Sequence, residues 1–190
     1  MSLASEDLEH ADDDALARQA QHDPEAFAQL YRRHLDRVYR YLLVHLRDAH
    51  LAQDLAAQTF LAALEGISGY RREGEFAAWL LSIARNKALE SFRKRQASVP
   101  LDVAARVASA DPSPERIIAA RLRLEQVVRA LRAVAPERAE ALELRVFGGL
   151  SVAEVGAIMG KSEAAVKMLI SRAVRDLRER LGPDGGEVGL

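Results

Sequence analysis

Apolar residues recur every three to four positions along much of this chain, the spacing that gathers them on one side of an α-helix. The apolar series from Phe27 to Leu46 predicts a first, long helix. A second helix is expected over about residues 50–65 and a third from near Glu75. Few β-branched residues alternate with polar ones, as they would in a strand. The pattern therefore predicts an all-α protein. The first series consists of Phe27, Leu30, Tyr31, Leu35, Val38, Tyr39, Leu42 and Leu46, and the third helix should turn Phe76, Leu80, Ile83, Ala84 and Ala88 inward.

Proline and glycine divide the helices into two groups, because proline lacks an amide donor and glycine loses backbone entropy inside a helix. No proline lies between Pro24 and Pro100, whereas Pro100, Pro112 and Pro114 cluster among serines and aspartates. That composition is typical of an extended, flexible tether. We therefore expect two helical domains joined by a flexible linker. The expected boundaries are an acidic N-terminal extension over 1–23, a first domain over 24–95, the linker over 96–114, a second domain over 115–182 and a flexible tail over 183–190.

The second domain carries the sharpest local signals. Helices are expected near 115–134, 136–147, 152–159 and 163–181, the last with Val166, Ile170, Ala173 and Leu177 facing inward. Ser151 and Glu154 have the spacing of a capping box, and Ser162 is suited to cap the helix that follows. Gly160 between them can adopt the left-handed conformation of a helix stop. Two helices joined by a tight glycine turn predict a helix-turn-helix, whose second helix lies in the major groove of DNA.

One face of the second helix of this pair supplies candidate DNA contacts. The alternative is a pair of packed helices with a solvated basic face, since helix-turn-helix signals also occur in ordinary bundles. The short first helix between two glycine-marked breaks favours the DNA-binding interpretation. The residues expected on the outward face or at its leading end are Ser162, Glu163, Ala164, Lys167, Met168, Ser171, Arg172 and Arg175.

Charge is nearly balanced over the whole chain, with 27 basic and 28 acidic residues, so the net charge of −1 does not decide for or against nucleic acid. Its distribution is uneven, because residues 1–25 are strongly acidic and residues 85–95 strongly basic. The basic end of the third helix and the Gly/Tyr/Arg loop before it could hold DNA through phosphate attraction and aromatic stacking. A charged helix end favoured by the macrodipole explains the same residues. Trp79 is expected in the core.

Signals for catalysis, metals and membranes are missing from the sequence. Cysteine is absent, and the five histidines include no pair at the spacing that puts two ligands on one helix face. No phosphate-binding glycine loop or organised nucleophile is visible. We expect no enzyme activity, no catalytic residue, no metal and no cofactor. Without a signal segment or a run of about 18 apolar residues, we also expect a cytoplasmic protein with no membrane insertion.

Several short motifs in a fixed order resemble those of one family. In the first domain they are Asp23-Pro24-Glu25-Ala26-Phe27 with Leu30-Tyr31, Asp54-Leu55 with Phe60-Leu61, and Phe76-Ala77-Ala78-Trp79-Leu80 with Ile83-Ala84-Arg85-Asn86. In the second they are Leu131, Pro136-Glu137-Arg138, Leu144-Arg145, Gly149-Leu150-Ser151, Glu154-Val155, Ala165-Val166-Lys167 and Arg172-Ala173. Together, over about residues 13–182, they resemble regions two and four of the extracytoplasmic-function (ECF) sigma factors of bacterial RNA polymerase.

The resemblance implies a transcription initiation factor that recognises promoters and helps to melt them. Its implied partners are core RNA polymerase, promoter DNA and an anti-sigma factor. It assigns core-polymerase binding to Asp54, Gln58, Phe60 and Leu61, and binding of the minus-ten element to Tyr70, Arg71, Arg72, Asn86, Lys87, Arg93 and Lys94. The outward face of the helix-turn-helix would bind the minus-thirty-five element.

Two pairs of adjacent residues depart from the family pattern. Ala57-Gln58 stands where Gln-Glu is usual, and Met168-Leu169 stands where a small polar residue and an arginine are usual. Losing one phosphate-binding cation should lower DNA affinity for all sequences and weaken its salt dependence. Two other functions stay open from the residues alone. One is a stand-alone helix-turn-helix transcriptional regulator that binds a symmetric operator as a dimer, and the other is a helical adaptor that binds only protein.

Overall fold

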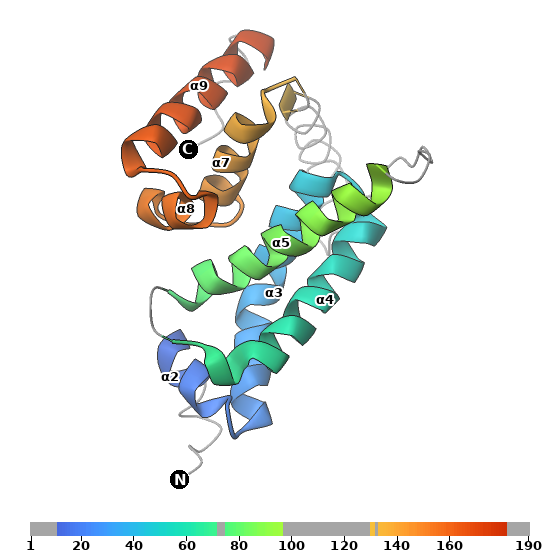
Figure 1. The fold of residues 1–190 in the computed structure, drawn as a ribbon, viewed down its shortest axis with the longest axis vertical. Helices are drawn as coiled ribbons and strands as arrows, with labels where there is room; N and C mark the ends of the chain where they lie inside the picture. The colour runs from blue at the N-terminus through green and yellow to red at the C-terminus, as the bar shows by residue number, and fades with distance from the viewer. Residues whose placement is uncertain (1–10, 72–74, 97–129, 132, 182–190) are drawn as a thin grey trace, which may run out of the picture. The chain divides into compact units, whose positions relative to one another are not determined.

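The computed structural model describes residues 11–71, 75–96, 130–131 and 133–181, and the structural statements below concern these residues. Their regular elements are all helical, which confirms the all-α prediction (Figure 1). They separate into two compact units, built mainly from α2 to α5 and from α7 to α9. The elements are α2 (Asp13–Gln19), α3 (Pro24–Leu46), α4 (Ala49–Gly66), the 3₁₀ turn η1 (Ile67–Gly69), α5 (Phe76–Gln96), α7 (Pro136–Val146), α8 (Val152–Met159) and α9 (Glu163–Leu181).

The long helix α3 supplies much of the core of the first unit. Leu30, Val38 and Leu42 are fully buried, as their spacing predicts. Tyr41 is also fully buried, although it lies outside the predicted apolar series, whereas Tyr31, which belongs to that series, is 40% exposed. The core-facing row follows Leu30, Val38 and Tyr41, because α3 packs against both α2 and α5. The predicted stripe was therefore too wide on the side of Tyr31.

Helix α2 corrects the prediction that residues 1–23 form an acidic extension outside the first domain. Asp12 caps this helix by accepting a hydrogen bond from the Ala15 amide, and Leu16 and Ala17 are fully buried against the neighbouring helices. Acidic residues far outnumber basic ones over residues 1–23, which is why the composition resembled that of a solvated segment. The first folded unit therefore includes α2, and residues 1–10 of the predicted extension lie outside the described part of the chain.

Helices α4 and α5 agree with the predicted second and third helices to within about one residue, a difference within the usual uncertainty of helix ends. Along α5, Phe76, Leu80, Ala84 and Ala88 are buried, whereas Ile83 is half-buried. The hydroxyl of Thr59, fully buried on α4, donates to the Leu55 carbonyl oxygen over 2.6 Å, so this polar side chain is satisfied within its own helix. The predicted inward face of α5 is thus confirmed at four of its five positions.

In the second unit, α8 and α9 have the predicted boundaries, and α7 ends one residue before the prediction. Val166, Ala173 and Leu177 of α9 are buried and Ile170 is half-buried. Of the helix predicted over 115–134, only Ala130 and Leu131 are described as helical. The linker beyond Gln96 and the tail over 183–190 also lie outside the described residues. Among the helices that are described, none combines the length and apolar character needed to cross a membrane.

Candidate functional site

The turn between α8 and α9 is held by two glycines. Gly160 adopts the left-handed conformation, with φ 65° and ψ 38°, and the amides of Gly160 and Lys161 both donate to the Gly156 carbonyl oxygen. The Lys161 carbonyl oxygen then lies so close to α8 that a Cβ on Gly156 would be only 2.7 Å from it. Sequence reasoning identified Gly160 but missed Gly156, although a glycine inside an eight-residue helix is itself a signal of close packing.

The start of α8 has the predicted capping box. The Ser151 amide donates to Glu154 Oε2 over 2.7 Å, and the Glu154 amide donates to Ser151 Oγ over 3.2 Å. Ser162 caps α9 in a similar way, because its hydroxyl oxygen accepts a hydrogen bond from the Ala165 amide over 3.3 Å. Each helix of the pair therefore begins at a residue that satisfies otherwise unpaired amides.

Ionic contacts join this helix pair to α7. Lys161 Nζ in the turn lies 2.7 Å from Glu137 Oε1, and Arg138 Nη1 lies 2.8 Å from Asp176 Oδ2 on α9. The Arg138–Asp176 pair is partly buried, so it is less screened by solvent than an exposed pair. Arg180 adds a hydrogen bond from its Nη2 to the Ala133 carbonyl oxygen over 3.0 Å. These contacts hold α9 and the turn against α7 and the residue Ala133 that precedes it.

The outward face of α9 is as the sequence predicts. All eight candidate residues are exposed. Six of them lie on the side of the helix away from the buried Val166 and Ala173, whereas Ser162 and Glu163 lie at its leading end. Lys167 Nζ lies 3.9 Å from Glu163 Oε2, an exposed pair one turn apart. Met168 is 52% exposed on this face. The structure thus brings together the residues Ser162, Glu163, Ala164, Lys167, Met168, Ser171, Arg172 and Arg175 on a surface that another molecule could reach.

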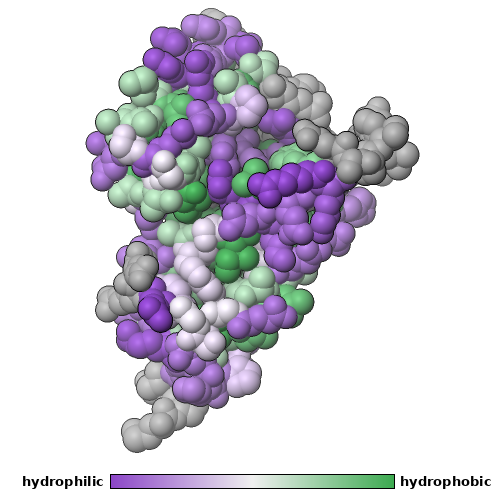
Figure 2. All heavy atoms as spheres, in the orientation of Figure 1, coloured by the Kyte–Doolittle hydropathy of each residue, from purple (hydrophilic) through white to green (hydrophobic). Residues whose placement is uncertain are grey.

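A second candidate surface lies on α4. Asp54, Gln58 and Leu61 are exposed, with Leu61 58% exposed, and Leu64 extends the apolar part of the same surface. Figure 2 shows hydrophobic side chains breaking the hydrophilic surface over α4. Phe60 differs from its predicted role, because it is only 4% exposed and its ring centroid lies 4.7 Å from that of Tyr31 in an edge-on contact. The prediction that Phe60 contacts a partner is corrected: it is a core residue beneath the surface.

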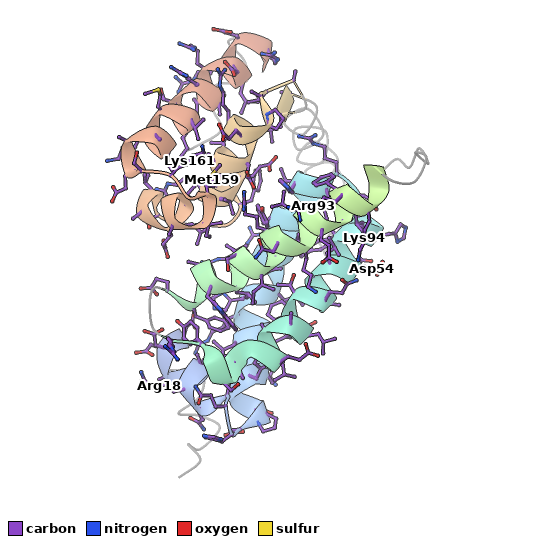
Figure 3. The ribbon with its side chains drawn as sticks, in the orientation of Figure 1. Arg18, Asp54, Arg93, Lys94, Met159 and Lys161 are labelled. Atoms are coloured by element: carbon purple, nitrogen blue, oxygen red, sulfur yellow. The ribbon has the colours of Figure 1, made fainter. Side chains whose placement is uncertain are left out.

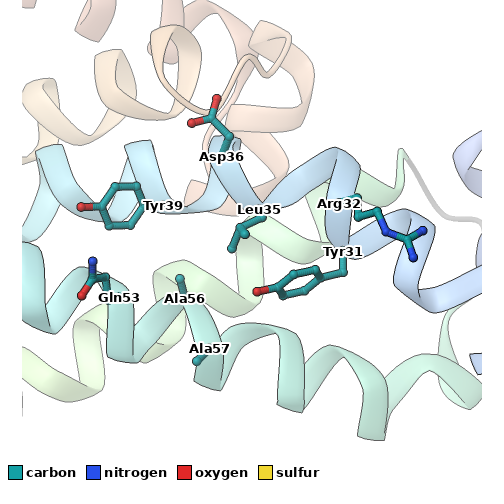
Figure 4. Close-up of a pocket in the computed structure, with 8 residues that line it drawn as sticks. All are labelled: Tyr31, Arg32, Leu35, Asp36, Tyr39, Gln53, Ala56 and Ala57. Carbon is teal, nitrogen blue, oxygen red and sulfur yellow. The ribbon is translucent and has the colours of Figure 1, made fainter. Parts of the chain in front are cut away.

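A groove of about 460 Å³ runs between α3 and α4 beside that surface (Figure 4). Arg32 and Asp36 are engaged with neighbours on α3, Arg32 with Glu25 at 2.9 Å and Asp36 with Arg40 at 2.6 Å. The groove was not predicted; the signal that could have indicated it is a pair of adjacent alanines opposite large aromatic residues. The lining consists of Tyr31, Arg32, Leu35, Asp36 and Tyr39 from α3 and Gln53, Ala56 and Ala57 from α4.

The candidate DNA contacts that precede α5 divide into packed and exposed residues. The ring of Tyr70 is half-buried, with its centroid 5.6 Å from that of Phe76 and 5.1 Å from that of Trp79. Trp79, which was expected in the core, is half-buried like Tyr70, and the contact of Tyr70 with DNA stays a prediction. Arg71 is exposed, and the predicted contact Arg72 lies outside the described residues.

The predicted contacts along α5 lie towards its basic C-terminal end. Asn86, Arg93 and Lys94 are exposed, whereas Lys87 is half-buried; Figure 3 labels Arg93 and Lys94 on α5 and Asp54 on α4. Lys94 Nζ lies 2.8 Å from Glu90 Oε1. The hydrogen bond from Lys94 and its positive charge hold the pKa of Glu90 below the usual value for a glutamate. The basic end of α5 therefore includes one cation that is already paired.

Comparisons with known families identify both units. The family described as Sigma-70 region 2 matches residues 30–98, and the family described as Sigma-70, region 4 matches residues 124–177. The first match contains α4 and α5, and the second contains α8 and most of α9, with the capping box and the glycine turn. The surfaces described above therefore fall inside the matched regions.

Individual relatives agree with these matches. The chain is 36% identical over 165 residues to the ECF RNA polymerase sigma factor BldN of Streptomyces coelicolor, covering 85% of this chain and 62% of BldN. It is 33% identical over 161 residues to the RNA polymerase sigma factor CarQ of Myxococcus xanthus, covering 83% of this chain and 90% of CarQ. The chain thus spans somewhat less than two thirds of BldN but most of CarQ.

Two solved structures resemble the fold. One is CnrH in complex with the cytosolic domain of CnrY, with a TM-score of 0.70, 26% identity, and coverage of 90% of this chain and 96% of that chain. The other is the sigma factor RpoE in complex with the anti-sigma factor NepR from Bartonella quintana, with a TM-score of 0.69, 25% identity, and coverage of 83% and 98%. Sequence and structure comparisons thus agree on the same kind of protein.

Proposed function

Because the chain belongs to the extracytoplasmic-function sigma factors of bacterial RNA polymerase, we propose that it binds core polymerase through α4 and carries the enzyme to promoters read by α5 and α9. The match of both sigma regions does not favour the alternative of a stand-alone regulator. The observation that carries the proposal is the exposed face of α9, the second helix of a pair whose first helix, α8, begins with a capping box. The proposed activity requires no catalytic residue from this chain and belongs in the cytoplasm, where bacterial polymerase works.

The polymerase contact is assigned to the exposed α4 surface. Asp54, Gln58 and Leu61 point away from the core, and the apolar groove between α3 and α4 adjoins them. An apolar surface of Leu61 and Leu64 bordered by Asp54 and Gln58 is the composition expected of a protein interface with an apolar centre and a polar rim. Phe60 supports this surface from within, because its ring fills the space beneath Tyr31.

Promoter binding is assigned to two separate surfaces. Asn86, Arg93, Lys94 and the exposed Arg71 would hold the minus-ten element, chiefly through phosphates. The outward face of α9 would enter the major groove at the minus-thirty-five element, with Lys167 and Arg172 on phosphates and the leading residues on base edges. Tyr70, whose ring is held against Phe76 and Trp79 at the start of α5, would contribute to the same surface.

Two small DNA-binding surfaces are weak separately. When polymerase holds both at a fixed separation, the second contact becomes intramolecular and the overall affinity rises without new contacts. Preference for the melted strand then shifts the promoter towards the open state. This chain alone should therefore bind duplex promoter DNA poorly.

We also propose an anti-sigma protein as a partner. CnrH and RpoE, the structural relatives, were each solved with a second protein bound, CnrY and NepR respectively. The support in this chain is the exposed apolar surface of α4 with Leu61 and Leu64 and the adjacent groove, which an apolar helix could cover. Such a partner would compete with core polymerase for the same residues.

Run-off transcription tests the main proposal. Core polymerase is incubated with a promoter library, alone and with this protein, and the transcripts are sequenced. Sequence-selective initiation only when both are present is expected. A Lys167→Ala, Arg172→Ala double variant should retain core binding and lose initiation. No initiation with a folded protein, or tight polymerase-free binding of a dimer to a symmetric site, would contradict the proposal and favour a stand-alone regulator.

A further inference from the structure

One apolar side chain stands out on the polar face of α9. Among the described side chains of this helix, Met168 is the only large hydrophobic one that is exposed, at 52%. Its neighbours on the same face are charged, hydroxyl-bearing or small. Single exposed apolar residues are common on protein surfaces, so exposure alone assigns no role. The role of Met168 depends on its position on the helix and on the chemical groups that it would contact there.

Met168 lies near the middle of the outward face. It is one helical turn from Ala164 and one turn from Arg172, the spacing at which side chains are neighbours on a helix surface. Lys167 precedes it directly, and the buried Val166 and Ala173 lie on the opposite side of the helix. Met168 is also in the leading part of α9, which begins at Glu163. In a helix-turn-helix this part of the second helix approaches base edges.

The rest of the unit prevents α9 from turning Met168 inward. Val166 and Ala173 are fully buried, and a rotation that covered Met168 would expose them to water. Asp176, two turns further along, is tied to Arg138 of α7 at 2.8 Å. The Ser162 cap fixes the other end of the helix. Met168 is therefore held at the surface that would face DNA.

The chemistry of methionine selects one feature of the major groove. The thioether is a poor hydrogen-bond partner, so it cannot replace a donor or acceptor at a base edge. The only apolar group that a standard base pair presents in the major groove is the C5-methyl of thymine. An unbranched, flexible methionine can adapt to contact it. The cations on either side, Lys167 and Arg172, are placed for phosphates and leave the base edge to Met168.

We propose that Met168 is a specificity-determining residue that reads a thymine methyl group in the upstream promoter element. The inference rests on the proposed sigma-factor function and adds the chemical group that is recognised. Removing that methyl, or the methionine, should cost about fourfold in initiation, the factor that corresponds to one buried methyl group. The thymine preference belongs to Met168 alone, whereas Lys167 contributes to affinity for every sequence.

Replacing thymine by deoxyuridine tests this directly, because it removes only the C5-methyl and leaves every hydrogen-bonding group. Thymines in the upstream element of a promoter that this protein uses are replaced one at a time, on either strand. Initiation by core polymerase with the full chain is measured at limiting protein. With the original protein, one position should lose about fourfold. With Met168→Ala, initiation should be weaker and equal on thymine and deoxyuridine at that position. Lys167→Ala should weaken initiation but keep the discrimination.

The possible outcomes separate the inference from the function on which it rests. Equal initiation on every substituted template by the original protein would overturn the role of Met168, as would discrimination that survives in Met168→Ala. A functional upstream element with no thymine at all would overturn it too. No initiation even on the unsubstituted promoter would instead contradict the sigma-factor activity and, with it, this inference. Far-ultraviolet circular dichroism verifies that each variant is folded, which is expected because both side chains are exposed.

Discussion

The phenolic oxygen of Tyr70 donates a hydrogen bond to Asp14 Oδ1 over 3.0 Å and thereby joins the segment ahead of α5 to helix α2. The Tyr70 ring packs at the same time against Phe76 and Trp79 of α5. Helix α2 is itself held on α3 by Asp13, which lies 2.6 Å from His34 and 3.0 Å from Arg33. Asp13 and Asp14 are therefore structural partners within the first unit, and Asp14 holds Tyr70 at the start of a proposed DNA-binding segment.

Removing the Tyr70 hydroxyl should weaken the first unit without disturbing the aromatic packing. Tyr70→Phe and Asp14→Ala are each expected to lower the free energy of unfolding by about 1 kcal/mol, the usual net contribution of such a hydrogen bond. Urea denaturation of both single variants and the double variant gives the coupling energy, which should also be near 1 kcal/mol. Strictly additive effects would show that the two side chains do not interact.

Asp13 should make stability depend on pH in the acid range. The hydrogen bond with His34, assisted by the charges of His34 and Arg33, holds the pKa of Asp13 below its usual value of 3.8, although partial burial opposes the shift. The unfolded chain then binds the proton more readily than the folded one, so this contribution is complete above pH 3.8 and is lost as pH falls through the lowered folded pKa.

The matched comparison for this prediction is Asp13→Asn. Urea unfolding of both proteins is measured between about pH 5 and pH 3, where aspartate titrates. The stability advantage of the original protein should be steady at the upper end and shrink towards the lower end. Because all other carboxyl groups are common to both proteins, an advantage that grows on acidification would show that the pKa shift has the opposite sign.

Gly156 should tolerate alanine far less well than a glycine with free space around it. In Gly156→Ala the new Cβ would lie 2.7 Å from the Lys161 carbonyl oxygen, so the turn must shift. A loss of about 1–3 kcal/mol is expected for such overpacking, together with reduced upstream promoter use. Gly69→Ala is the control, since nothing lies within 4 Å of its Cβ position. Thermal unfolding and transcription assays measure both effects; equal stability of the two variants would rule out the close approach.

Adjacent residues on α4 should separate stability from polymerase binding. Phe60→Ala removes a buried ring and should cost about 3–5 kcal/mol in stability. Leu61→Ala removes an exposed side chain and should change stability by less than about 0.5 kcal/mol. If α4 binds core polymerase, the Leu61 variant should bind it at least about fivefold more weakly, which corresponds to about 1 kcal/mol of lost binding free energy. Unaltered affinity of the folded Leu61 variant would place the polymerase contact elsewhere.

The helix-turn-helix was predictable in detail because its determinants are local. Ser151 and Glu154 satisfy amides within one turn, Gly160 stops the helix by its own backbone conformation, and Ser162 starts the next one. The outward face of α9 then follows from the 3.6-residue period of a helix. Gly156 escaped notice, because its close neighbour is the backbone of Lys161 across the turn rather than a residue in its own helix.

The errors in the first unit share a different cause. The apolar spacing placed Tyr31 inside and the family resemblance placed Phe60 at a partner surface, whereas the rings meet with Phe60 buried and Tyr31 exposed. The sequence predicted that residues 13–19 are solvated, whereas in the structure Leu16 is buried against the neighbouring helices. Each of these results depends on which helix packs on which face, and apolar spacing within one helix does not contain that information.

The amino-acid sequence by itself determined the helical class, the helix ends marked by caps, proline and glycine, and the polar face of α9. Only the tertiary structure decided that Asp14 meets Tyr70, that α2 belongs to the first unit, and that a groove opens between α3 and α4. The physical reason is the distance along the chain over which each kind of interaction acts. Backbone hydrogen bonds and caps act within about one helical turn, whereas burial and side-chain pairing depend on residues brought together from distant parts of the chain.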